Sequence, residues 1–404
     1  MPADRTLLVT VTGRDRPGVT SALFGALAGA DIEVVDVEQV VIRGRLVLGV
    51  LVSVGDDEGK VRAELAEVAE HLGMDVEVAA GPGEDEAPQL GGQLHVTVLG
   101  HPLRPAAVAA VAARIAGCGA NIDRITRLSS YPVTSLELDL SGADNAARLR
   151  RELVAEAAVG GFDIAVQPAG LHRRAKRLVV MDVDSTLIQA EVIELLAERA
   201  GQGAEVARVT EAAMRGELDF EASLRRRVAL LAGLPADAVD EVRRAVTLTP
   251  GARTLVRTLK RLDHEIGIVS GGFTQVTDAL AAELGLDYSA ANTLEVVDGR
   301  LTGGLVGPVI DRAGKAAALE RFAAAAGVPL SQTVAIGDGA NDLDMLARAG
   351  LGVAFNAKPV VREAAQVSLS VPYLDAILFL LGITREEVEA ADAGELPLPP
   401  PTHT

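Results

Sequence analysis

From residue 177 onward, short apolar runs alternate with stretches of helical periodicity, and this alternation most constrains the fold. Apolar, β-branched strands separated by helices favour a parallel sheet that is buried on both faces. We therefore expect an α/β fold between residues 177 and 390. The four runs that we interpret as its strands are RLVVMD (177–182), EIGIVS (265–270), TVAIGD (333–338) and LGVAFN (351–356).

A long helical insertion separates the first two runs. Its segments space their apolar residues as helices do, and three of the four run into a glycine at or just beyond their end. Such an insertion should form a helical cap, at about 188–249, over the carboxyl end of the sheet, where ligands bind in open α/β folds. The segments are AEVIELLAERAG (190–201), EVARVTEAAMRG (205–216), FEASLRRRVALLAG (220–233) and ADAVDEVRRAV (236–246).

The N-terminal part of the chain contains two units that repeat each other. LLVTVTG (7–13) is echoed by LHVTVLG (94–100), and each is followed by an Arg-Pro pair and an Ala-rich helical stretch. Further strands complete the order strand, helix, strand, strand, helix, strand. This order predicts two ferredoxin-like α+β units, at 1–81 and 93–168.

Three stretches interrupt these patterns. GPGEDEAPQLGG (81–92) has the composition of a solvated linker, and PAGLHRRAKR (168–177) that of a basic turn. The proline-rich end, 391–404, lacks the backbone donors that regular structure needs, so we predict a disordered tail there.

The composition argues against several classes of protein. A formal net charge of −18 does not suit a nucleic-acid partner, which requires clustered Lys and Arg. Cys118 is the only cysteine, which rules out an internal disulfide and fits a reducing compartment. No apolar run approaches the roughly 18 residues of a membrane-spanning helix, and the start has no signal-peptide pattern. We expect a soluble, cytoplasmic protein that binds no membrane.

The first strand ends in MDVDSTL (181–187), with two carboxylates, Asp182 and Asp184, two residues apart. Alternation in a regular strand would point them to opposite faces, so the chain must leave the strand there for both to reach one ligand. Taken alone, this short motif is weak evidence for a catalytic site, because it is also typical of a simple helix N-cap.

Three further fragments follow strands in the same way. VSGG (269–272) offers the hydroxyl of Ser270 and open backbone N–H groups near a helix start, which suits an anion. Lys315 lies at the beginning of a helix, where it complements no dipole. GDGANDLDML (337–346) places Asp338 at a strand end, with Asn341 and Asp342 on the next turn. Each fragment could also be purely structural: VSGG a plain turn, Lys315 a solvated side chain and Asp338 a helix cap. Four such fragments in this order nevertheless indicate a catalytic site.

This ordered set resembles the four motifs of haloacid dehalogenase-type phosphatases, and the resemblance implies a Rossmann-like parallel sheet with an inserted helical cap. It implies that Asp182 is the nucleophile and forms an aspartyl-phosphate, while Asp184 is general acid and then base. Mg²⁺ would be held by Asp182, the backbone carbonyl of Asp184 and Asp338, with Asp342 nearby. Ser270, the Gly271 N–H and Lys315 would hold the phosphoryl oxygens.

Within that superfamily, the insertion resembles the cap of phosphoserine phosphatases, through DVDSTLIQAEVIELLAERAG (182–201), MRGELDFEASLRRRVALLAGL (214–234) and LTPGA (248–252). L-Phosphoserine carries an ammonium and a carboxylate, which Glu191 and Arg227 would bind. The resemblance also implies that Met214 and Phe220 exclude water and that Asn341 contacts the phosphate or orients Asp182. Glu191 as a first-turn helix acid, and 225–227 as a plain basic face, are the structural alternatives.

The two N-terminal units resemble ACT domains, regulatory modules that commonly bind amino acids. The resemblance rests on GRDRPGV (13–19) and ADIEVVDVEQ (30–39); the second unit has Ala106 where the first has Gly18 and lacks an acid matching Asp15. It implies an amino-acid effector, with serine as the candidate, bound near Asp15 and Gly18, and a homodimer paired through the sheets. The alternative is that both units are purely structural.

The resulting hypothesis is a phosphatase that releases L-serine from L-phosphoserine in the last step of serine biosynthesis, with feedback through the ACT region. A second hypothesis keeps the chemistry but changes the substrate to another small phosphomonoester or a phosphoprotein. A third is an amino-acid-binding regulator with an inactive phosphatase half. The presence of Asp182, Asp184, Ser270, Lys315 and Asp338 argues against it.

Overall fold

The computed structural model describes residues 5–28, 32–54, 58–80, 93–170, 173, 175–215 and 217–394. The chain divides into two compact units, Met1–Gln89 and Leu90–Thr404. The predicted linker at 81–92 lies outside the described residues.

The first unit has the predicted ferredoxin-like order. Its antiparallel sheet runs β2-β3-β1-β4, and the two helices pack on one core with the alternate residues of β1 and β3 that face them. The elements are β1 (Arg5–Arg14), α1 (Val19–Leu27), β2 (Ile32–Ile42), β3 (Arg45–Val54), α2 (Glu58–Leu72) and β4 (Asp75–Ala80).

The second ferredoxin-like motif opens the second unit and confirms the predicted repeat. Its antiparallel strands run β8-β5-β7-β6, with the core between this sheet and its two helices. The elements are β5 (Leu94–Gly100), α3 (Pro105–Gly117), β6 (Asn121–Ser129), β7 (Thr134–Ser141), α4 (Ala146–Gly160) and β8 (Asp163–Pro168).

This second motif continues into the α/β part as one eleven-stranded sheet. β8 pairs antiparallel with β15 (Val367–Leu369) through Ile164 and Ser368. Asp163 accepts hydrogen bonds from the Ser370 N–H and Oγ–H, at 2.7 and 2.6 Å. The sequence did not predict this junction, and the domain boundaries that we drew from it remain a prediction.

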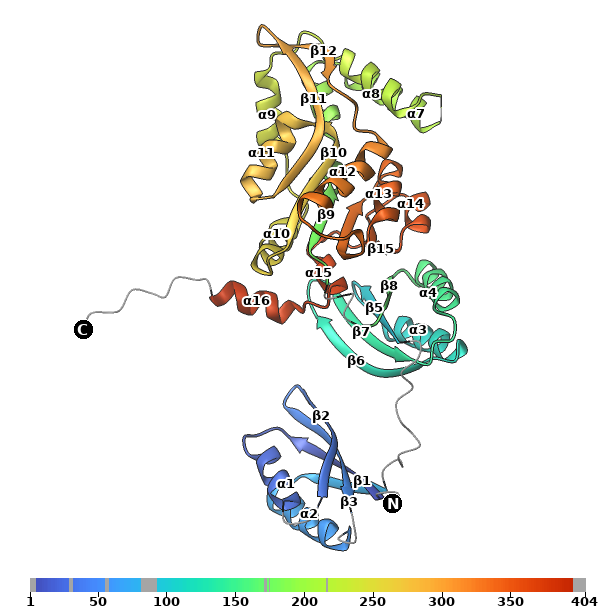
Figure 1. Ribbon diagram of the computed structural model, residues 1–404, viewed down its shortest axis with the longest axis vertical. Helices are drawn as coiled ribbons and strands as arrows, with labels where there is room; N and C mark the ends of the chain where they lie inside the picture. Colours follow the sequence, from blue (N-terminus) through green and yellow to red (C-terminus); the bar gives the residue numbers. More distant parts are fainter. Residues whose placement is uncertain are drawn as a thin grey trace, which may run out of the picture. The chain divides into compact units, whose positions relative to one another are not determined.

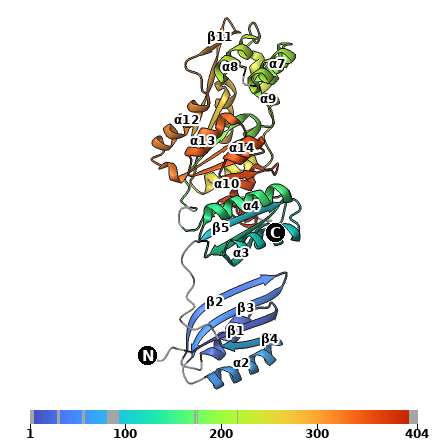
Figure 2. The same ribbon diagram turned by 90° about the vertical axis from the view of Figure 1, so that its right-hand side faces the viewer.

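The α/β part contains the predicted parallel sheet, in the order β11-β10-β9-β13-β14-β15, with β12 antiparallel at its edge. Figure 1 labels β9, β10, β11, β12 and β15 of this sheet, and Figure 2 gives the view turned by 90°. All four apolar runs predicted as strands lie in it. The strands are β9 (Leu178–Asp182), β10 (Glu265–Phe273), β11 (Tyr288–Val297), β12 (Arg300–Val306), β13 (Thr333–Gly337), β14 (Leu351–Phe355) and β15.

Helices cover both faces of this sheet, which is why successive residues of its central strand β9, from Leu178 to Met181, are all apolar and buried. Val179 and Met181 of β9 face one core, with α10 and α11, and Leu178 and Val180 face another, with α12 and α13. The helices are α10 (Ala252–Arg261), α11 (Thr274–Leu284), α12 (Arg312–Ala325), α13 (Leu343–Arg348), α14 (Pro359–Ala364), α15 (Ile377–Leu380) and α16 (Arg385–Gly394).

The predicted helical insertion follows β9. Its two ends pair where they leave the sheet, through an antiparallel bridge between Ile188 and Leu248. Each of the four helical segments predicted from periodicity contains a helix. They are α6 (Val192–Arg199), α7 (Gly203–Met214), α8 (Phe220–Ala229) and α9 (Asp237–Ala245).

Two stretches differ from the sequence-based expectation. Arg173, in the expected basic turn, is buried: it donates to the carbonyls of Leu380 and Phe379 and forms an ion pair with Glu137. The first four residues of the expected tail are the last turn of α16, whose Asp392 bonds to Arg257 and Arg261 of α10; residues 395–404 lie outside the described part. No helix in the described ranges is long and apolar enough to cross a membrane.

Candidate active site

The two aspartates that follow β9 reach the same cavity because the chain leaves the strand between them. Asp182 keeps extended backbone angles, and its Oδ1 accepts the Val183 N–H at 2.8 Å. Residues Val183–Leu187 then form a single π-type turn, in which Ser185 has a left-handed φ of 58°. Such a conformation is unfavourable for a residue with a Cβ and persists only where its surroundings enforce it.

Lys315 is fully buried between two carboxylates at this end of the sheet. Its Nζ lies 2.8 Å from Asp182 Oδ1 and 2.7 Å from Asp342 Oδ1. Burial alone would lower the pKa of Lys315, but the charges of Asp182 and Asp342 outweigh it and hold the pKa above its ordinary value. The ammonium therefore stays charged beside the candidate nucleophile.

Asp184 is held by two donors on different elements. Its Oδ1 accepts the Val192 N–H and its Oδ2 accepts the Ser270 hydroxyl, both at 2.8 Å. Burial raises the pKa of Asp184 despite these bonds, which favours a protonated carboxyl. Gly272 makes the approach possible, because a Cβ there would lie 2.9 Å from Asp184 Oδ2.

Three carboxylates cluster where β9 and β13 end. Oxygen atoms of Asp182, Asp338 and Asp342 lie within 4.8 Å of one another. Burial and the charge of Asp342 raise the pKa of Asp338 to about 6, and the same two causes raise that of Asp182 well above its ordinary value. Crowded, desolvated carboxylates of this kind are stabilised by a cation, and an all-oxygen donor set suits a hard divalent metal.

A cavity of about 460 Å³ joins this cluster to the helical cap. Arg227 of α8 lines it, and its Nε is buried without a hydrogen-bond partner among the described residues. Glu191 lines it too: Ser185 donates to it at 3.1 Å, and burial followed by the charge of Asp184 raises its pKa to about 7. Arg225, by contrast, is exposed and pairs with Glu221.

The remaining predicted residues distribute as follows. Phe220, Gly271 and Asn341 line the cavity, and a Cβ on Gly271 would lie 3.0 Å from the Phe220 ring. Ser270 is fully buried and accepts the Gly272 N–H at 2.6 Å while it donates to Asp184. Met214 ends α7, but its side chain lies outside the described residues.

Two cationic residues that sequence reasoning missed, Arg312 and Lys358, also line the cavity. Arg312 lies three residues before Lys315 on α12, a spacing that puts both on one helix face. Lys358 follows the carboxyl end of β14, as the other fragments follow β9, β10 and β13. The spacing of Arg312 from Lys315 and the position of Lys358 after a predicted strand could both have been found in the sequence.

The predicted effector residues lie at the turn between β1 and α1 of the first unit. Gly18 has a φ of 98°, which only glycine adopts readily, and the exposed Asp15 donates its N–H to the Gly44 carbonyl at 2.9 Å. In the second unit Pro105 is the first residue of α3, so Ala106 already lies in the helix. The two turns therefore differ in conformation.

Comparison with known proteins identifies a family for the α/β part and for each of the two ferredoxin-like repeats. Residues 179–347 match the haloacid dehalogenase-like hydrolase family, and 5–79 and 93–167 each match an ACT domain family. The chain is 65% identical to a phosphoserine phosphatase of Streptomyces coelicolor, over 96% of this chain and 94% of that one. It is 55% identical to phosphoserine phosphatase SerB2 of Mycobacterium tuberculosis, over 98% and 97%.

A solved structure extends the similarity to the fold. A probable phosphoserine phosphatase from Vibrio cholerae, unliganded, is 34% identical with a TM-score of 0.58, covering 76% of this chain and 91% of that one. The fold and site thus define a haloacid dehalogenase-like hydrolase with two ACT domains. Within that class, the chain belongs to the phosphoserine phosphatase family.

We expect a divalent cation to stabilise the protein through the carboxylate cluster. MgCl₂ at a hundred times its dissociation constant should add about 2.7 kcal/mol to the free energy of unfolding, because the cation binds only the folded state. Asp338→Asn should remove most of this gain, whereas Asp344→Asn, at an exposed ion pair with Arg312, should not. Thermal unfolding with and without MgCl₂ measures the effect, and equal gains in both variants would contradict the site.

Proposed function

We propose that this enzyme hydrolyses L-phosphoserine to L-serine and phosphate in the cytoplasm, as the last step of serine biosynthesis. The observation that carries the proposal is the cavity itself, in which Asp182 beside a buried lysine faces a cap with a carboxylate and an arginine whose Nε has no hydrogen-bond partner among the described residues. The similarity to relatives named as phosphoserine phosphatases supports the same substrate.

In the proposed first step, an Oδ atom of Asp182 attacks phosphorus and the bond from phosphorus to the serine oxygen breaks. Asp184 gives its proton to that oxygen, which a raised pKa favours. Water then attacks the aspartyl-phosphate, Asp184 takes a proton from it, and Asp182 is released. Lys315 lowers the repulsion between Asp182 and the phosphoryl group.

Mg²⁺ is the cation that we propose for the carboxylate cluster, because it prefers oxygen ligands. Asp182, the backbone carbonyl of Asp184, Asp338 and Asp342 would hold it. When bound, it supplies positive charge that neutralises the phosphoryl oxygens. The Gly271 N–H and Asn341 would orient those oxygens from the other side. Ser270 would donate to them only by releasing its hydrogen bond to Asp184.

Substrate selection is assigned to the cap. Arg227 would donate to the substrate carboxylate, which would give its buried Nε, unpartnered among the described residues, a counter-charge. Glu191 would bind the ammonium, and a neighbouring cation would bring its raised pKa down and keep it ionised. Phe220 and Met214 would exclude water from the reacting atoms.

We propose that the ACT region binds an amino acid, serine in the first instance, and that the protein is a homodimer. The left-handed Gly18 leaves backbone open to a ligand near Asp15. The exposed outer strand β2 supports pairing, because it carries six apolar side chains on an unpaired edge: Val34, Val35, Val37, Val40, Val41 and Ile42.

Phosphate release from a panel of phosphomonoesters tests the function. We expect strong preference for L-phosphoserine over phosphothreonine, phosphotyrosine and sugar phosphates, and loss of activity with EDTA. Asp182→Asn should abolish turnover while its circular dichroism spectrum stays unchanged. Activity spread across the panel would retain the chemistry and reject the substrate, and a fully active Asp182→Asn would reject the nucleophile.

Arg227→Met tests the carboxylate contact against a substrate that lacks the carboxylate. We expect kcat/KM for L-phosphoserine to fall about 10- to 100-fold, the value of a charged hydrogen bond, and that for phosphoethanolamine to change little. Arg225→Met, on the same helix but exposed, is the matched control. Equal losses of kcat/KM on both substrates would mean that Arg227 does not bind the substrate carboxylate.

A serine titration tests the effector. We expect L-serine to raise the melting temperature and lower the rate, since an effector must bind one state of the enzyme preferentially. Gly18→Ala should weaken this response, because alanine disfavours the φ of 98°. A titration that changes neither kinetics nor melting temperature would contradict the proposal.

A further inference from the structure

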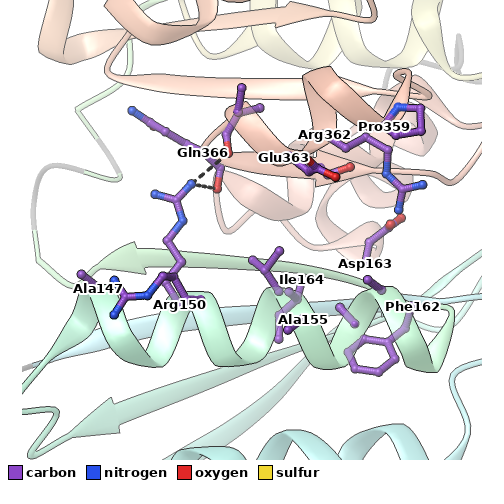
Figure 3. Close-up of a pocket in the computed structure, with 17 residues that line it drawn as sticks. Ala147, Arg150, Ala155, Phe162, Asp163, Ile164, Pro359, Arg362, Glu363 and Gln366 are labelled. Atoms are coloured by element: carbon purple, nitrogen blue, oxygen red, sulfur yellow. Dashed lines mark hydrogen bonds between the residues drawn. The ribbon is translucent and has the colours of Figure 1, made fainter.

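A second cavity, of about 780 Å³, lies where the second ferredoxin-like motif meets the α/β part of the same unit (Figure 3). Helix α4 and strand β8 form one side, and α14 with β15 forms the other. It shares no lining residue with the candidate active site. Its size falls within the range of small-molecule sites.

Arg150 of α4 brings an uncompensated positive charge to this cavity. Its Nη2 donates to the Ala365 carbonyl at 3.0 Å and to the Gln366 carbonyl, as Figure 3 shows. In the described part of the chain it has no carboxylate partner, and burial lowers its pKa. A half-buried charge that lacks a counter-ion is costly, so an anion beside it would stabilise the folded state.

The other charged groups around the cavity leave Arg150 as the anchor for an anion. Arg362 of α14 extends toward Asp163 (Figure 3). Burial raises the pKa of Asp163, and the positive charge of Arg362 partly offsets that rise. Asp163 is itself occupied by the two bonds from Ser370. Glu363 and Arg151 line the rim and are exposed.

The side of the cavity formed by α4 and β8, from which Arg150 also extends, carries apolar residues. Ala155 of α4, Phe162 and Ile164 line it, and all three are labelled in Figure 3. Ser368 also lines the cavity, and its Oγ is buried without a hydrogen-bond partner among the described residues. A cation, an unused hydroxyl and an apolar wall together complement a ligand that is anionic at one end and apolar at the other.

We infer that this cavity binds a small carboxylate that carries a compact apolar group, with the carboxylate on Arg150 and the apolar group against Ala155, Phe162 and Ile164. The site is separate from the expected effector turn at Asp15 and Gly18, which belongs to the first unit.

The chain connects this cavity directly to the candidate active site. Pro359, the first residue of α14, lines the second cavity, and Lys358, the residue before it, lines the active-site cavity. A ligand that displaces α14 therefore displaces Lys358 beside the substrate. This coupling rests on the proposed function, and it predicts a changed KM for L-phosphoserine when the second cavity is filled.

Isothermal titration calorimetry of the full chain tests the site without using turnover. The probe is 3-phenylpropanoate, which we expect to bind saturably. 3-Phenyl-1-propanol, which lacks the charge, and acetate, which lacks the apolar group, should bind at least about tenfold more weakly, as loss of a charged hydrogen bond or of apolar burial requires. Absence of saturable binding, or equal binding of the alcohol, would overturn the proposal.

Two variants locate the probe independently. Arg150→Met removes the charge, and Ala155→Phe fills the cavity from an exposed position on α4; each should weaken binding at least about tenfold. Arg148→Met, on the same helix but outside the cavity, should bind as the parent does. Undiminished binding by both cavity variants would place the probe elsewhere. Binding with no change in KM would retain the site and overturn its coupling to Lys358.

Discussion

The buried contact of Lys315 with Asp182 and Asp342 is the interaction on which the candidate active site depends. Removing the lysine would leave two buried carboxylates without a counter-charge, at a cost of about 3–5 kcal/mol. The lysine also sets the charge balance: with Asp182, Asp338 and Asp342 ionised, the cluster keeps two net negative charges. A divalent cation neutralises them, and Asp184, nearby but buried, then favours its protonated form.

This cluster forms because parallel strands that are distant in sequence end side by side. β9 pairs with β10 on one side and β13 on the other, so Asp182, Ser270 and Asp338 meet although more than 150 residues separate the first from the last. Helix α12 brings Lys315 from outside the sheet. Close approach requires glycine at Gly272, where a side chain would displace Asp184. The topology thus supplies the position and the local sequence supplies the chemistry.

The sequence predicted what is encoded locally. Strand runs, helix periodicity and the carboxylates of MDVDSTL each depend on a few neighbouring residues, so the parallel sheet, the helical insertion and several of the residues that meet in the cavity could be inferred, although Arg312 and Lys358 were missed. The pairing of β8 with β15 could not be inferred, because β15 has only three residues and forms a single bridge with β8. The burial of Arg173 was also hidden, since its partners lie on β7 and α15.

Because β8 pairs with β15, the second repeat is joined to the α/β sheet, whereas the first repeat is a separate compact unit. One bridge between Ile164 and Ser368 contributes little. A shared core that includes Leu99, Leu128 and Ala165 of the second repeat joins it to the α/β part. Side-chain bonds add to this contact: those of Asp163 with Ser370, of Gln167 with the Leu380 carbonyl, and of Arg173. The second repeat is therefore built into the catalytic unit, and its proline-started helix α3 has no left-handed turn. The first repeat is a compact unit with its own core and keeps the left-handed Gly18. Although the repeats share one fold, only the first retains the open turn at which an amino acid is expected to bind, while the second is fixed to the sheet that positions the aspartates of the candidate active site.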